Sequence, residues 1–117
     1  MRWHAEHELK EGVMRHCSDS PAWKHFNSTH PSFASENRNV RLGLCIDGFQ
    51  PFGQSGQQYS SWPVILTPYN LPFSICMKEE YMFLTIIVPG SRNPKDMLDV
   101  YLQPLIVELK HLWEVGV

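Results

Sequence analysis

The spacing of apolar residues predicts three strands. Residues 40–47 alternate, with an aliphatic side chain at every even position, which is the two-residue period of a β-strand. Because the odd positions are also mostly apolar or small, we expect this strand inside a sheet rather than at its edge. Two more strands are predicted at residues 62–66 and 81–88. Pro63 and Pro68 limit the ladder hydrogen bonds that the second strand can make.

A helical period dominates the C-terminal part of the sequence. Apolar side chains share one stripe there: Leu98, Leu102, Leu105, Leu109 and Leu112. This stripe predicts an amphipathic helix with its leucines in the core. The helix is expected to start at Asp96 or Asp99, to run to about Trp113 and to stop at Gly116. Pro104 lies inside it and either kinks the helix or marks its first turn.

Residues 1–38 are polar and poor in aliphatic side chains. One short helix is predicted there, with Ser20 as N-cap and Pro21 in the first helical position. Trp23 and Phe26 would share a face of this helix.

The order strand, strand, strand, helix predicts an α/β domain that opens with a three-stranded antiparallel meander. We expect residues 39–117 to form this domain and residues 1–38 to be an irregular or helical lead-in segment. A helix in this position normally crosses over to a further strand, parallel to an earlier one. We therefore expect the domain to be incomplete at its C-terminal end.

Composition and charge exclude several classes of protein. The chain has 117 residues, 43% hydrophobic and 19% charged, with a net charge of −2, so it lacks the strong basic footprint of a dedicated DNA-binding module. Three cysteines far apart suit reduced thiols rather than a disulfide framework. No signal peptide or membrane span is predicted, and we expect a nuclear or cytoplasmic protein that is not secreted. The six histidines lack the paired spacing of a zinc site.

Several stretches together resemble a known family. They are MRWHAE (residues 1–6), AWKHFNSTHPSFASENRNVRLGL (22–44), RLGLCIDGFQPFG (41–53), WPVILTPYNLP (62–72), ICMK (75–78), IVPG (87–90) and DVYLQPLIVELKHLW (99–113). In this order they resemble the transposases of plant CACTA-type (En/Spm) DNA elements, over nearly the whole chain.

The resemblance implies a ribonuclease-H-like catalytic fold, of which this chain would hold the first three strands and the first helix. Such transposases cut and rejoin DNA with two Mg²⁺ ions held by three carboxylates. By the resemblance, Asp47 corresponds to the first of these acids and is both a catalytic residue and a metal ligand. The other two acids would lie beyond this sequence. We therefore expect Mg²⁺ only in the complete parent enzyme and no activity from this chain alone.

Alternatives remain for each of these residues. By spacing alone, Asp47 before Gly48 is an ordinary turn pair at the end of a strand, and the resemblance favours the metal ligand. Arg38 and Arg41 are weak candidates for contacts with DNA phosphates, and equally for solvated charges at a strand entrance. A second possible function is a non-catalytic, transposon-derived module. It would bind transposon-end DNA, a second copy of itself or an intact transposase.

Overall fold

The computed structural model describes residues 1–7, 12–51, 59–90, 94 and 97–116. These residues belong to two compact units. Unit 1 is formed by Met1–Leu44 and Leu66–Phe83, and unit 2 by Cys45–Ile65 and Leu84–Val117.

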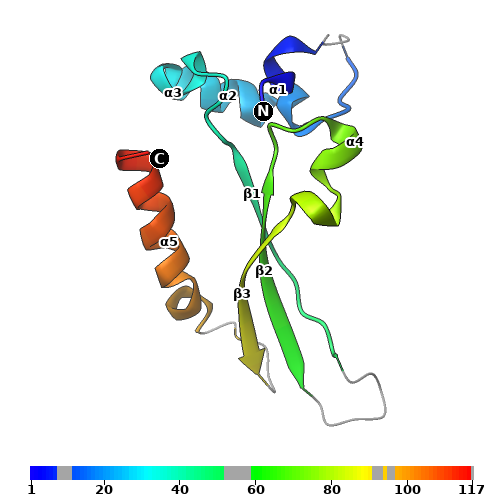
Figure 1. Cartoon of the computed structure of the whole chain (residues 1–117), viewed down its shortest axis with the longest axis vertical. Coiled ribbons are helices and arrows are strands. Elements are labelled where there is room, and N and C mark those ends of the chain that lie inside the picture. Colours follow the sequence, from blue (N-terminus) through cyan, green and yellow to red (C-terminus); the bar gives the residue numbers. More distant parts are fainter. Residues whose placement is uncertain (8–11, 52–58, 91–93, 95–96, 117) are drawn as a thin grey trace. The chain divides into compact units, whose positions relative to one another are not determined.

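Three strands form one antiparallel sheet with the order β1-β2-β3 (Figure 1). They are β1 (Leu42–Ile46), β2 (Ser60–Pro68) and β3 (Phe83–Gly90). With the helices before and after it, this sheet confirms the predicted α/β class, the meander and the helical N-terminal segment. The boundary between residues 38 and 39 stays a prediction.

One expectation about the strands was wrong. β1 is an edge strand of the described sheet, not an internal one, and Leu42 and Leu44 are 38% and 49% exposed. Alternation of apolar side chains reports the chemistry of both strand faces and does not report whether the backbone has one neighbour or two. β2 is the central strand although it contains both Pro63 and Pro68.

The lead-in segment contains more helix than the one that the sequence predicts. Its elements are α1 (Trp3–Glu6), η1 (Cys17–Asp19), α2 (Pro21–Thr29) and α3 (Pro31–Ser35). The Ser20 hydroxyl accepts a hydrogen bond from the Trp23 N–H at 3.2 Å, which confirms the predicted cap of α2.

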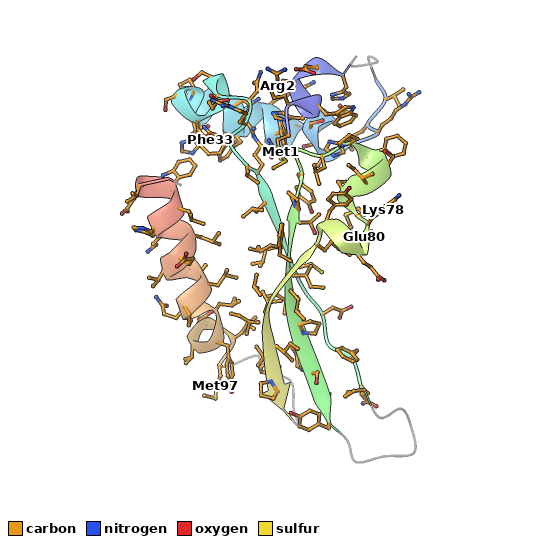
Figure 2. All side chains as sticks on the ribbon, viewed as in Figure 1. Met1, Arg2, Phe33, Lys78, Glu80 and Met97 are labelled. Atoms are coloured by element: carbon orange, nitrogen blue, oxygen red, sulfur yellow. The ribbon has the colours of Figure 1, made fainter. Side chains whose placement is uncertain are left out.

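Two short helical turns, α4 (Phe73–Cys76) and η3 (Glu79–Tyr81), connect β2 to β3. Figure 2 shows the side chains of Lys78 and Glu80 pointing away from this connection, in agreement with their exposure.

The last helix, α5 (Leu98–Glu114), follows the predicted range closely. Its N-cap is Met97, without a side-chain hydrogen bond, so the helix starts between the two expected positions, Asp96 and Asp99. Asp99 lies in the first turn instead, where its charge still favours the helix dipole. Asp96, the other candidate, lies outside the described residues. Gly116 has a positive φ of 81° after the helix, as expected of a glycine that ends one.

Each unit has a small core. In unit 2, Val64 and Val88 are fully buried, and Leu105 of α5 is 9% exposed. In unit 1 the buried side chains include Leu66 and Cys76. Within the described part of the chain, every helix is too short or too polar to cross a membrane.

Candidate functional site

Asp47 directly follows β1, in unit 2. Its side chain is exposed, and its Oδ1 accepts a hydrogen bond from the Gly48 N–H at 2.8 Å. Phe49, two residues after Asp47, forms an antiparallel bridge with Ser61, with N–H···O distances of 2.9 Å in both directions. Backbone pairing with the second strand therefore resumes two residues after Asp47.

Gly48 packs against an aromatic ring from β2. A Cβ atom at position 48 would lie 2.7–2.8 Å from three atoms of the Trp62 indole ring. Real Cβ atoms essentially never approach other heavy atoms this closely, so any larger residue at position 48 would displace the ring or the backbone.

This contact changes the interpretation of the Asp-Gly pair. A turn with glycine in the left-handed region needs a positive φ. In the described residues, positive φ values occur at Gly12 and Gly116, and Gly48 is not among them. Glycine at position 48 is thus explained by the close approach of Trp62, and Asp47 lies between the end of β1 at Ile46 and the isolated Phe49–Ser61 bridge.

The carboxylate chemistry around Asp47 fits one ligand of a metal site and not a whole set. An exposed carboxylate is a suitable ligand for Mg²⁺. However, the described residues contain no group of three His, Cys, Asp or Glu side chains that could hold a metal ion. Any metal chemistry would need further ligands.

Arg38 lies in unit 1 and already has a partner. Its Nε and Nη2 donate to the two carboxylate oxygens of Glu36 at 3.0 and 2.7 Å. These hydrogen bonds lower the pKa of Glu36 to about 2. The Arg38 side chain is 75% exposed, so the pair is screened by water and adds little stability.

Arg41, also in unit 1, is held in an aromatic cage. Its guanidinium carbon lies 4.4 Å from the ring centroid of Trp23, 5.3 Å from that of Phe33 and 5.8 Å from that of Phe26. Nη2 donates to Asn27 Oδ1 at 2.7 Å, and burial lowers the pKa of Arg41. The predicted common face of Trp23 and Phe26 thus contacts an arginine. The contact of either arginine with DNA stays a prediction.

Asn70 holds the backbone of the residues just before β1 and is fully buried. Its Oδ1 accepts from the Arg41 backbone N–H at 2.6 Å, and its Nδ2 donates to the Asn39 carbonyl at 2.9 Å. The Tyr69 N–H donates to the Arg41 carbonyl at 2.8 Å. The structural role of Asn70 was not predicted from the sequence, because an asparagine between Pro68 and Pro72 is typical of an exposed turn.

A second polar network ties α1 to η1. His7 Nε2 lies 2.9 Å from Asp19 Oδ1, and Asp19 Oδ2 accepts from the backbone N–H groups of Arg15 and His16. The hydrogen bond from Arg15 is the main reason that the pKa of Asp19 is lowered. Burial raises the pKa of the nearby Cys17 thiol, so this cysteine is not an activated nucleophile.

The geometry predicts that unit 1 loses stability as the pH falls from about 7.5 to about 5. Burial, and then the charge of Arg41, lower the pKa of His4 from 6.5. Its Nε2 lies 3.3 Å from Arg41 Nη1, so a proton there would face a cation. Burial likewise lowers the pKa of His16. The charge of Asp19 raises this pKa, and the charge of His7 lowers it further.

The sign follows from proton binding: the unfolded chain takes up these protons first, so the stabilisation is present above pH 6.5 and lost below it. Urea unfolding at both pH values measures the difference. His4→Gln should reduce the pH dependence, and His25→Gln, at an exposed position of α2, should leave it unchanged. Equal stability at both pH values would contradict the prediction.

Comparison with known proteins supplies the decisive observation. The family model described as transposase family tnp2 matches residues 11–117. The chain belongs to this family of transposases. Searches of curated proteins and of solved structures gave no significant match. The match covers Asp47, both candidate arginines and all three strands, so the transposase part of the resemblance is confirmed.

Proposed function

We propose that this chain is part of the catalytic domain of a CACTA-type transposase, whose complete enzyme cuts and rejoins DNA at transposon ends. The observation that carries the proposal is the tnp2 family match over residues 11–117. The collinear resemblance to plant CACTA elements, which includes the DGF sequence at residues 47–49, supports the narrower assignment. We expect the protein to be located in the nucleus or the cytoplasm, in keeping with this function.

In this proposal the three strands and α5 belong to a ribonuclease-H-like fold, and Asp47 is its first acid. The antiparallel meander followed by a helix supports the fold assignment. The exposed carboxylate of Asp47 at the end of β1 supports its role as a ligand. Two Mg²⁺ ions in such an enzyme activate the attacking oxygen and stabilise the leaving oxygen.

The chain alone is proposed to be inactive. One carboxylate cannot hold a pair of divalent ions. Three acids that follow Asp47 in the sequence have ordinary roles: Glu79 and Glu80 are exposed in η3, and Asp99 lies in the first turn of α5. Asp47 is the single residue of this sequence that corresponds to a triad acid.

Incubation of the purified chain with labelled transposon-end DNA and Mg²⁺ or Mn²⁺ tests this proposal. We expect the wild-type chain to give no more cleavage than Asp47→Ala or the control Asp99→Ala, because all three lack a complete ligand set. Cleavage that Asp47→Ala abolishes and Asp99→Ala retains would show that the chain is an active nuclease and would contradict the proposed inactivity.

A second function is supported by the edge position of β1. An edge strand presents unpaired N–H and C=O groups that can pair with another chain, and Leu42 and Leu44 on this strand are exposed. The chain would then act as a binding module for a second copy, an intact transposase or DNA. Dimers or larger assemblies of the purified chain in size-exclusion chromatography would support this function, and a monodisperse monomer would count against it.

A further inference from the structure

We propose that Trp62 is a positioning residue for Asp47: its indole ring packs on Gly48 and fixes the backbone that presents the Asp47 carboxylate. The catalytic meaning of this contact rests on the proposed function, whereas the contact itself does not.

The first observation is the space between the two residues. Three ring atoms of Trp62, namely Cζ2, Cε2 and Cη2, lie within 2.8 Å of the place where a Cβ at position 48 would be. The ring therefore lies directly on the backbone of Gly48. Since Gly48 does not have a positive φ, backbone conformation does not require glycine here, and the ring contact does.

The second observation is the bridge next to the ring. Phe49 and Ser61 exchange two backbone hydrogen bonds of 2.9 Å, and Trp62 follows Ser61 on β2. Two consecutive residues of β2 thus hold the two residues that follow Asp47. The Gly48 N–H donates to Asp47 Oδ1 at 2.8 Å, so fixing Gly48 also fixes one oxygen of the carboxylate.

The third observation concerns the indole N–H. Trp62 Nε1 is buried and has no hydrogen-bond partner among the described residues. Burying an unpaired donor costs free energy, so a hydrogen bond does not explain where the ring lies. Its packing on Gly48 does. Phenylalanine lacks the N–H and keeps a smaller aromatic ring, so it is the intermediate variant in the test.

The test uses NMR spectra of the whole ¹⁵N-labelled chain without metal or DNA. The spectrum of Asp47→Ala defines the Gly48 amide resonance when its bond to the carboxylate is absent. We expect nuclear Overhauser contacts between the Gly48 Hα protons and the Trp62 ring in the wild type. Trp62→Phe should give a Gly48 amide position between those of the wild type and Trp62→Ala, because an aromatic ring remains but the Cζ2 and Cη2 atoms that lie on Gly48 do not.

Trp62→Ala should move the Gly48 resonance towards its position in Asp47→Ala, because only the neighbouring Phe49–Ser61 bridge then restrains the Gly48 backbone. The amide of Val88, a fully buried residue in the same unit as Gly48 and Trp62, should not move and reports that unit 2 is still folded. If Trp62→Ala does not fold, Trp62→Leu replaces it, since leucine fills part of the space without a flat ring.

A double-mutant cycle gives a second, independent measurement. Gly48→Ala and Trp62→Ala should each lower the free energy of unfolding of unit 2, and the double variant should lose less than the sum of both changes, because each disturbs the same contact. Additive losses of stability, or a Gly48 resonance that Trp62→Ala and Trp62→Leu leave unmoved, would overturn the positioning role. The NMR experiment contains no metal or DNA, so its result is independent of the outcome of the nuclease assay.

Discussion

Replacing Asn70 by alanine is expected to lower the free energy of unfolding of unit 1 by about 2–5 kcal/mol. Asn70 is fully buried, and its amide is the hydrogen-bond partner of the Arg41 N–H and the Asn39 carbonyl. Alanine leaves both backbone groups without a partner inside the protein. Each such group costs about 1–3 kcal/mol, and a small domain has little stability to lose.

The matched control for this change is Asn37→Ala. Asn37 is an exposed asparagine in the same unit, so its removal should have almost no effect. Asn70→Asp is informative because it keeps the acceptor for Arg41 and loses the donor to Asn39. We expect it to be at least as destabilising as Asn70→Ala, because it buries a carboxylate and places an oxygen against the Asn39 carbonyl.

Urea unfolding followed by the amide resonances of unit 1 measures these differences. The slope of the unfolding curve should stay the same if stability alone has changed. An Asn70→Ala chain as stable as Asn37→Ala would show that water satisfies the exposed groups and that Asn70 does not hold the start of β1.

Local sequence rules predicted some elements well, because the physical cause lies within a few residues. Ser20 followed by Pro21 is sufficient to start α2, and the period of the leucines is sufficient to define α5. The end of the first strand at Asp47 follows from the same kind of pattern. These features depend on backbone geometry that neighbouring residues determine.

Other features depend on residues that are distant in the sequence. Asn70 bonds to Arg41, 29 positions away, and the sequence shows only an asparagine between two prolines. Gly48 is required by the ring of Trp62, whereas the sequence suggests an ordinary Asp-Gly turn. Contacts of this kind follow from the register of β1 against β2, which the alternation of apolar residues alone does not specify.

The same reasoning explains the wrong position of β1 in the sheet. The apolar character of residues 40–47 is real, and it remains partly exposed at Leu42 and Leu44. Exposed apolar side chains on an edge strand favour association. The sequence pattern therefore identifies a strand whose composition suits pairing with a strand on each side, and in the described sheet β1 pairs on one side, with β2.

Replacing Arg41 by alanine is expected to cost about 2–4 kcal/mol of stability, because the change removes a cation from an aromatic cage and a hydrogen bond to Asn27. The distances of 4.4 Å to the Trp23 centroid and 2.7 Å to Asn27 Oδ1 support this expectation. Arg41→Lys should be intermediate, since lysine keeps the charge but lacks the planar group that stacks and donates in two directions.

Arg38→Ala is the matched control, because Arg38 is exposed and paired with Glu36 on the surface. We expect no measurable loss of stability from it.

Urea unfolding of the three variants, followed by measurement of DNA binding under conditions where each is folded, separates a role in folding from a direct role in DNA binding. If folded Arg41→Ala bound DNA as the wild type does while Arg38→Ala bound it less, the two arginines predicted together as phosphate contacts would have different functions. If Arg41→Ala were as stable as Arg38→Ala, the cage would not contribute to folding, and the guanidinium would remain available for a phosphate.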